Sequence, residues 1–156
     1  MEPGDIFVAI RGERVDGHQF IREVFDKGAI AVVCEEEPEE LPGPCIRVED
    51  SLAALRQIAA FYREQMPIPI VGITGSVGKT STKEFVASVL AQKYKTHKTQ
   101  GNFNNEIGVP LTLLAMPEDA EAAVVEMGIN HFGEMHRLSE MVKPDICVMT
   151  NIGQCH

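Results

Sequence analysis

The stretch Gly72-Ile-Thr-Gly-Ser-Val-Gly-Lys-Thr-Ser81 decides the expected fold. The apolar residues 70–74 are typical of a buried strand, and residues 79–91 after the turn have the apolar spacing of a helix. Gly75 and Gly78 allow the turn to point backbone N–H groups at a phosphate, and the helix N-terminus adds partial positive charge. A strand, a glycine-containing turn and a helix in this order predict a phosphate-binding loop.

The residues of this loop have separate expected roles. Lys79 is expected to face solvent without a protein partner and to reach the β- and γ-phosphates, and Thr80 to hold Mg²⁺ through its hydroxyl. The full set of predicted phosphate contacts is Gly75, Ser76, Val77, Gly78, Lys79, Thr80 and Ser81. The spacing departs from the common pattern, because Ile73 occupies the place of its first glycine. The alternative is a tight turn with a surface lysine, which the flanking strand and helix disfavour.

Composition excludes several classes of protein. The chain has 156 residues, a net charge of −9 and 44% hydrophobic residues, as expected for one globular domain or two small ones. The negative charge argues against a nucleic-acid surface, and no apolar run approaches the ~20 residues of a membrane helix. The N-terminus lacks the pattern of a signal peptide. The four cysteines form no C-x-x-C pair, which argues against a zinc or disulfide framework and favours a reducing cytoplasm.

Pro67-Ile-Pro69 divides the chain into two expected domains, residues 1–66 and 67–156. The elements expected in the first are strands at 6–10, 29–33 and 45–48, and helices at 20–27 and after residue 50. Those expected in the second are strands at 70–74, 122–127 and 145–150, and helices at 79–91, 109–115 and 133–141. The helix at 79–91 is expected to turn Phe85, Val86, Val89 and Leu90 to a core. Continuous apolar strands between helices predict an α/β fold with a parallel sheet covered on both faces.

Two further residues are expected near the phosphate loop, at the carboxyl ends of the strands. Glu126 lies at the end of the strand at 122–127, and ligands of parallel α/β sheets bind beyond this edge. Its carboxylate is a candidate Mg²⁺ ligand, and the alternative is a solvated strand-end glutamate. Residues 151–156 follow the next strand and reach the same rim, where His156 is either a second metal ligand or an ordinary surface histidine. His18, by contrast, is expected to be solvated.

Three asparagines precede the helix at 109–115, in the segment Gly101-Asn-Phe-Asn-Asn-Glu-Ile-Gly-Val-Pro110. One helix cap does not require so many. The amides of Asn104 and Asn105 are therefore candidates for contacts with a ligand or with Mg²⁺-bound water, and a turn with a simple cap is the alternative. Asn130 and His131 follow Glu126 closely and are candidates for the same pocket.

Together these motifs resemble the Mur ligase family. Residues 74–80 are similar to its phosphate loop, T-G-[TS]-x-G-K-[TS], which accounts for the missing first glycine. Residues 101–114 and 126–134 are similar to the member that adds D-alanyl-D-alanine, and Asn104-Asn105 stands where the tripeptide-forming relative has Thr-Thr-Pro. Residues 4–20 resemble the uridine-nucleotide domain of these enzymes. The resemblance spans essentially the whole chain but only the first part of such an enzyme.

The resemblance implies a small N-terminal α/β domain for a UDP-MurNAc-peptide, residues 1–66, and the first part of a phosphate-loop ATPase domain, residues 67–156. It implies an ATP-dependent ligase of peptidoglycan precursor synthesis that joins D-alanyl-D-alanine to UDP-MurNAc-tripeptide through an acyl phosphate. The implied ligands are Thr80 and Glu126 for one Mg²⁺ and His156 for a second Mg²⁺. The implied catalytic residues are Lys79, Asn104, Asn105 and His156.

The resemblance also implies that the chain is a fragment. The end of the ATPase domain, with its carbamylated lysine and adenine contacts, and the C-terminal domain are expected to be absent, so we expect no ligation by the chain alone. Its last apolar strand, residues 145–150, would form an exposed edge through which the fragment self-associates. The alternatives are another Mur-type ligase, tripeptide-forming or folylpolyglutamate-type, and a non-catalytic nucleotide-binding module. A GTPase is disfavoured because no Asn-Lys-x-Asp motif occurs.

Overall fold

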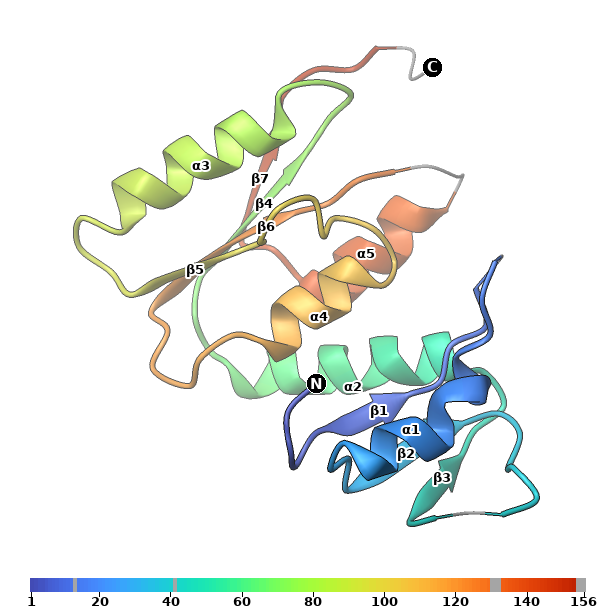
Figure 1. Ribbon diagram of the computed structural model, residues 1–156. Helices are drawn as coiled ribbons and strands as arrows, with labels where there is room; N and C mark the ends of the chain where they lie inside the picture. Colours follow the sequence, from blue (N-terminus) through green and yellow to red (C-terminus); the bar gives the residue numbers. More distant parts are fainter. Residues whose placement is uncertain (13, 41, 130–132, 154–156) are drawn as a thin grey trace. The chain divides into compact units, whose positions relative to one another are not determined.

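The computed structural model of the chain describes residues 1–12, 14–40, 42–129 and 133–153 (Figure 1). The chain divides into two compact units, Met1–Leu55 and Arg56–His156. This division lies inside helix α2 (Ser51–Gln65), whereas the boundary expected from the sequence follows that helix. None of the helices in the described part has the length and apolar character that a membrane crossing requires.

The first unit contains a parallel sheet of three strands in the order β1-β2-β3. The strands are β1 (Ile6–Val8), β2 (Ala31–Cys34) and β3 (Cys45–Arg47), and the 3-10 helix η1 (Gly17–Phe20) and helix α1 (Ile21–Asp26) connect the first two. Ile21 and Val24 of α1 belong to the same buried cluster as Val32 of β2. Gly28 follows α1 with a φ of 98°, a left-handed conformation that ends the helix.

Cys34 and Cys45 form a disulfide. Cys34 ends β2 and Cys45 begins β3, and these strands are neighbours in the sheet. The expectation that the chain has no disulfide framework is therefore wrong for this pair. A search for C-x-x-C spacing detects only local pairs, and parallel strand pairing here joins cysteines 11 positions apart in the sequence.

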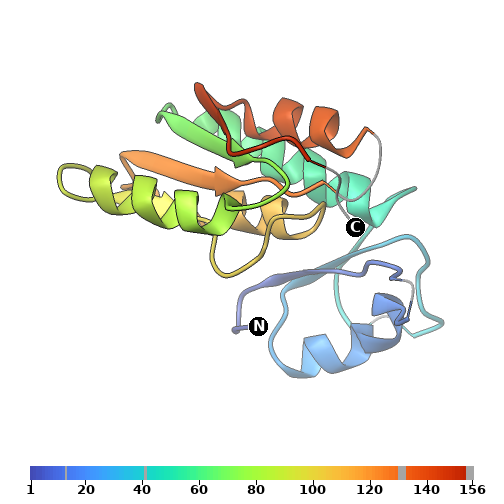
Figure 2. The ribbon, with the colours of Figure 1, turned by 90° about the horizontal axis from the view of Figure 1, so that it is seen from above.

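The second unit is built on a parallel four-stranded sheet in the order β5-β6-β4-β7. The strands are β5 (Thr96–Lys98), β6 (Ala122–Glu126), β4 (Ile70–Thr74) and β7 (Ile146–Met149). Helix α3 (Lys79–Leu90) covers one face, and α2, α4 (Gly108–Leu114) and α5 (Glu134–Val142) cover the other (Figure 2). The expected α/β fold is confirmed, and only β5 has no counterpart among the predicted strands, because its Thr-His-Lys residues are polar.

Helix α3 turns a different side to the sheet from the one expected. Val86 and Leu90 pack against the sheet as predicted, but Phe85 and Val89 are 74% and 71% exposed, so the prediction is wrong for them. The buried side of the helix includes Lys83, which is fully covered. The prediction counted only apolar residues as buried. It therefore missed Lys83 on the buried side of the helix and placed Phe85 and Val89 there instead.

Polar side chains anchor helix α2 within the second unit. Tyr62 donates its hydroxyl proton to Met116 O at 2.7 Å, and Arg63 Nε donates to Val142 O at 2.9 Å. At the start of the helix, the Asp50 carboxylate accepts a hydrogen bond from the Ala53 N–H at 2.8 Å and so caps it. The hydrogen bonds of Tyr62 and Arg63 hold α2 against the turn before β6 and the end of α5.

Strand β7 forms one edge of the larger sheet and carries exposed apolar side chains. Ile146 and Met149 are 58% and 59% exposed, and β4 is the neighbour on the paired side. An apolar edge strand with free backbone groups is a template for pairing with another chain. Within the described residues, β7 is therefore an exposed apolar edge of this sheet.

We expect the 156-residue chain to self-associate through β7. Ile146→Lys places a charge on this edge and should shift the sedimentation coefficient toward that of a monomer. Val89→Lys, which adds the same charge at an exposed apolar position of α3, is the control and should leave the association unchanged. A wild-type chain that stays monomeric at high concentration would contradict the prediction, as would equal effects of the two variants.

Candidate functional site

Two glycines shape the loop between β4 and α3. Gly75 has a φ of 131° and Gly78 a φ of 85°, both in the left-handed region that favours glycine. A Cβ at Gly75 would lie 2.2 Å from Thr150 Oγ1, so packing also requires glycine there. Gly78 is the N-cap of α3, and a Cβ at this position would meet nothing within 4 Å. The first N–H groups of α3, which have no acceptor within the helix, are the donors that such a loop offers to a phosphate.

The segment that follows β7 holds this loop in place. Ser76 N donates to Asn151 O at 3.1 Å, and Val77 N donates to Asn151 Oδ1 at 3.1 Å. Thr150 Oγ1 donates to Val77 O at 2.6 Å. The expectation that the chain after this strand reaches the rim of the loop is confirmed for residues 151–153. The sequence did not indicate that Asn151 itself binds the loop backbone.

Lys79 is held by the loop rather than extended into solvent. It is half-buried, and its Nζ donates to Gly75 O at 2.7 Å. The expectation of a solvent-facing lysine without a partner is therefore wrong. The first residue of α3 lies directly above the turn, so its long side chain reaches back to the nearest backbone carbonyl. A phosphate oxygen would replace that carbonyl as the acceptor of the ammonium.

The Glu126 carboxylate connects the phosphate loop with a second loop. Glu126 ends β6 and pairs in register with Ile73 of β4, which brings it beside the start of the phosphate loop. Its Oε1 accepts hydrogen bonds from Thr80 Oγ1 at 3.2 Å and from Asn104 Nδ2 at 2.8 Å. The predicted proximity of Glu126 and Thr80 is confirmed. Glu126 is only 1% exposed, which excludes a solvated strand-end glutamate.

The two adjacent asparagines have different contacts. Asn104 points its amide at Glu126, and its backbone O accepts a hydrogen bond from Gly128 N at 2.7 Å. Asn105 Oδ1 accepts hydrogen bonds from Ile107 N at 3.2 Å and Gly108 N at 2.8 Å, so it caps α4. The structure therefore brings Asn104 into the candidate site and gives Asn105 the capping contact that was the alternative for this motif.

Lys83 belongs to the same cluster and was not among the predicted site residues. Its Nζ donates to Gly101 O at 3.0 Å and lies 3.6 Å from Glu126 Oε2. Lys83 follows Thr80 by three positions, so both residues lie on one side of α3. This spacing is the signal in the sequence that could have indicated Lys83.

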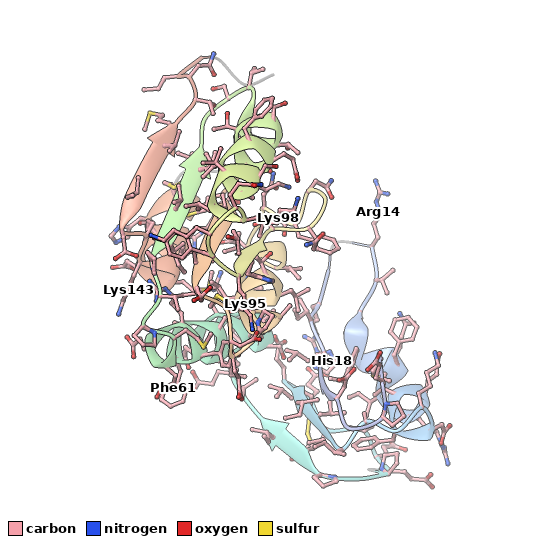
Figure 3. All side chains as sticks on the ribbon, turned by 90° about the vertical axis from the view of Figure 1, so that its left-hand side faces the viewer. Arg14, His18, Phe61, Lys95, Lys98 and Lys143 are labelled. Atoms are coloured by element: carbon pink, nitrogen blue, oxygen red, sulfur yellow. A yellow bond between two sulfur atoms is a disulfide. The ribbon has the colours of Figure 1, made fainter. Side chains whose placement is uncertain are left out.

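A partly exposed ion pair flanks this cluster. Lys98 of β5, labelled in Figure 3, pairs with Glu84 of α3. Lys83 Nζ also lies 3.4 Å from Glu84 Oε1, and Glu84 is 47% exposed. The hydrogen bond from Lys98, with a further one from Lys83, lowers the pKa of the Glu84 carboxyl. Glu84 therefore forms ion pairs with two lysines at a partly exposed position. Glu126, in contrast, is a buried carboxylate beside Lys83.

The residues around Glu126 fit a magnesium ion. Glu126 Oε2 is buried and accepts no hydrogen bond from the described residues, and carboxylate and hydroxyl oxygens are suitable Mg²⁺ ligands. Within the described residues, no three His, Cys, Asp or Glu side chains gather as a metal cluster, so the fit rests on Glu126 and Thr80. His156, the further predicted ligand, lies outside the described residues, as do Asn130 and His131.

A separate polar cluster lies in the first unit around His18 of η1, which is labelled in Figure 3. His18 Nε2 accepts a hydrogen bond from Glu35 N at 3.0 Å, and Nδ1 lies 2.6 Å from Asp16 Oδ1. Hydrogen bonds from the backbone N–H and the ring of His18 lower the pKa of the Asp16 carboxyl. The expectation that His18 is solvated is therefore wrong. Beside it, Arg11 pairs with Glu36 at 2.8 Å in an open cavity.

Comparison with known proteins connects both units to one family. The Mur ligase middle domain matches residues 73–156, and the family described as Mur ligase family, catalytic domain, matches residues 1–63. A UDP-N-acetylmuramoyl-tripeptide–D-alanyl-D-alanine ligase from Bacillus subtilis is 45% identical over 100% of this chain. The crystal structure of MurF from Acinetobacter baumannii matches 99% of the chain at 38% identity with a TM-score of 0.94. That of MurF from Thermotoga maritima in complex with ADP matches 98% at 37% identity with a TM-score of 0.90.

The chain spans about a third of the length of these relatives: 35% of the Bacillus enzyme and 34% and 36% of the two crystallised proteins. The middle-domain match contains the phosphate loop, Glu126 and residues 101–107, called here the asparagine loop, and it covers more than half of the chain. The fold, the loop between β4 and α3 and these matches agree, and the chain therefore belongs to the Mur ligase family, as a homologue of its MurF ligases.

Proposed function

We propose that this chain provides the ATP-phosphate and Mg²⁺ site of a ligase that joins D-alanyl-D-alanine to UDP-MurNAc-tripeptide. The observation that carries the proposal is the hydrogen bond between Thr80, at the end of the phosphate loop, and the buried Glu126 carboxylate. The names of the relatives supply the reaction, and one of them was crystallised with ADP. In this proposal residues 1–66 serve the UDP-MurNAc-peptide and residues 67–156 serve the nucleotide.

The residues of the loop have direct roles in the proposed phosphoryl transfer. The terminal carboxylate of the tripeptide attacks the γ-phosphate of ATP and releases ADP. The amine of D-alanyl-D-alanine then attacks the carbonyl carbon of the acyl phosphate, loses a proton and displaces inorganic phosphate. Lys79 and the N–H groups at the start of α3 bind the phosphates and offset their charge. Thr80 and Glu126 hold Mg²⁺, which supplies further positive charge at the phosphates. Asn104 is the proposed amide contact near the γ-phosphate, because Asn105 caps α4.

Two parts of the proposal rest on family motifs. His156 is the proposed ligand of a second Mg²⁺. Residues 4–20, which include Arg11 and His18, are proposed to lie near the uridine end of the substrate. The polar cluster around His18 supports the assignment of residues 4–20. It holds this segment in place, and it puts the charged side chain of Arg11 in an open cavity.

For the 156 residues alone, we propose nucleotide binding without ligation. The observation behind this narrower function is that the chain spans about a third of the length of its relatives. Isothermal titration of the chain with ATP in the presence of Mg²⁺ tests the nucleotide site. Absence of heat, together with an unchanged melting temperature at saturating ATP, would refute the nucleotide site.

Lys79→Ala should weaken the binding of Mg²⁺-ATP by about 10- to 100-fold, because a charge-assisted hydrogen bond contributes about 1.5–3 kcal/mol. The melting temperature should change little, since the residue is half-buried and bonds only a loop carbonyl among the described residues. Lys93→Ala removes an exposed lysine after α3 and is the control. Unchanged affinity in Lys79→Ala would show that this loop is not the phosphate site.

Glu126→Gln should abolish the dependence of nucleotide affinity on Mg²⁺ while leaving affinity in EDTA unchanged. The amide keeps an acceptor for Thr80 and the size of the side chain, but it removes the negative charge that attracts the metal. The matched control is Glu84→Gln, which removes the exposed carboxylate beside Lys83. Titration calorimetry with and without Mg²⁺ decides the point, and a normal Mg²⁺ effect in Glu126→Gln would refute the metal site.

The chain alone should form no product from ATP, UDP-MurNAc-tripeptide and D-alanyl-D-alanine. The physical reason is that the proposed catalytic groups of the described residues bind phosphates and metal, and none of them is assigned to the dipeptide. Phosphate release and chromatography of the product check this expectation. Ligation above the background without protein would show that the 156 residues suffice for the whole reaction.

A further inference from the structure

The ammonium of Lys83 contacts two other segments of the second unit, besides Glu84 on its own helix. It projects from α3, donates to Gly101 O at 3.0 Å, and lies 3.6 Å from Glu126 Oε2 at the end of β6. The side chain of Lys83 is 1% exposed, as is that of Glu126. A lysine is almost never buried without partners, because removing its charge from water is costly. These contacts are therefore the reason that the fold retains a lysine here.

The distances show which contact is the shortest. The hydrogen bond to the Gly101 carbonyl, at 3.0 Å, is shorter than the separations of 3.4 Å from Glu84 Oε1 and 3.6 Å from Glu126 Oε2. Lys83 thus binds the backbone of the asparagine loop directly and faces the carboxylate across a slightly larger gap. Glu126 Oε1 is the oxygen that accepts hydrogen bonds from Thr80 and Asn104. The ammonium consequently lies beside the second oxygen of the carboxylate and leaves the first to these partners.

The far end of the asparagine loop, residues 101–107, has its own anchors. Glu106 Oε1 accepts hydrogen bonds from Arg137 Nε at 2.7 Å and from Arg56 Nη1 at 3.2 Å. The near end begins at Gly101, whose φ of 51° is left-handed and whose carbonyl binds Lys83. Asn104 therefore lies between two fixed points, one on the arginine side and one on the Lys83 side.

We propose that Lys83 is a positioning residue of the nucleotide and metal site. Its ammonium fixes the start of the asparagine loop and the Glu126 carboxylate relative to α3, so that Asn104 and Thr80 meet the same carboxylate oxygen. This inference rests on the proposed function, since the site that Lys83 organises is the proposed Mg²⁺ and phosphate site. Lys83 touches neither phosphate nor metal in this proposal and acts through Glu126 and the loop.

The test measures how strongly Mg²⁺ enhances ADP binding to the 156-residue chain. The enhancement is the ratio of the dissociation constants without and with Mg²⁺, and it reports the coupling between metal and nucleotide. Lys83→Met keeps the length of the side chain but removes the ammonium. It should reduce the enhancement by about 10-fold or more, as loss of groups that orient metal ligands does, while ADP affinity in EDTA stays the same. A purely structural role would instead weaken ADP binding equally under both conditions.

The control is Lys98→Met, which also removes a lysine beside Glu84 and which should leave the enhancement unchanged. An unchanged enhancement in Lys83→Met overturns the proposal. An increased enhancement also overturns it, because Lys83 would then act only as a positive charge that competes with the metal. If the wild-type chain binds no ADP, the proposed function fails, and the positioning role is decided by hydrogen exchange.

Hydrogen exchange of residues 101–107 gives the second measurement and needs no ligand. Lys83→Met combined with Glu126→Gln buries no unpaired charge, so this pair of changes guards against simple unfolding. Amides of the loop should exchange at least about 10-fold faster in this double variant than in the wild-type chain, which likewise buries no unpaired charge here, because local opening of the loop becomes easier. Equal exchange in the two proteins overturns the proposal, whatever the nucleotide data show.

Discussion

The buried Glu126 carboxylate is the constraint on which the arrangement of this site depends. Burying a charged carboxylate costs several kcal/mol unless hydrogen bonds and an opposite charge surround it. Here Thr80 and Asn104 supply the hydrogen bonds and Lys83 the positive charge. These partners come from α3 and from the loop before α4, so strand register, helix start and loop conformation must all be correct together. The site is consequently organised by the fold itself, with its polar groups oriented before any ligand binds.

Much of this site could be predicted from the sequence, because the relevant rules are local or follow from sheet topology. The glycine pattern at Gly75 and Gly78 specifies a backbone that few other residues adopt, and the structure has it. The proximity of Glu126 to Thr80 follows from the rule that the carboxyl ends of parallel strands share one edge. The choice between Asn104 and Asn105 did not follow from spacing, since only the path of the loop decides which amide turns inward.

The features that sequence reasoning did not predict depend on long-range contacts of polar or exposed residues. Lys83 is buried because a loop carbonyl and a carboxylate meet it, and neither partner is a neighbour in the sequence. Because α3 turns Lys83 toward the sheet, Phe85 and Val89 point to solvent. The disulfide in the first unit depends on which strands pair. The spacing of apolar residues identifies a helix. It does not decide which side of the helix faces the sheet when polar side chains also bind there.

The hydrogen bonds from the phosphate loop to Asn151 have a consequence for the order of folding. Val77 and Asn151 lie 74 positions apart in the sequence, and β4 pairs with β6 and β7, which both follow it. Contacts between such distant segments form late, because closing a long loop of chain costs entropy that only the final packing repays. During synthesis, the first unit and the early turns of α3 can form while the phosphate loop still lacks its support. The loop between β4 and α3 is therefore among the last parts of these 156 residues to reach its final arrangement.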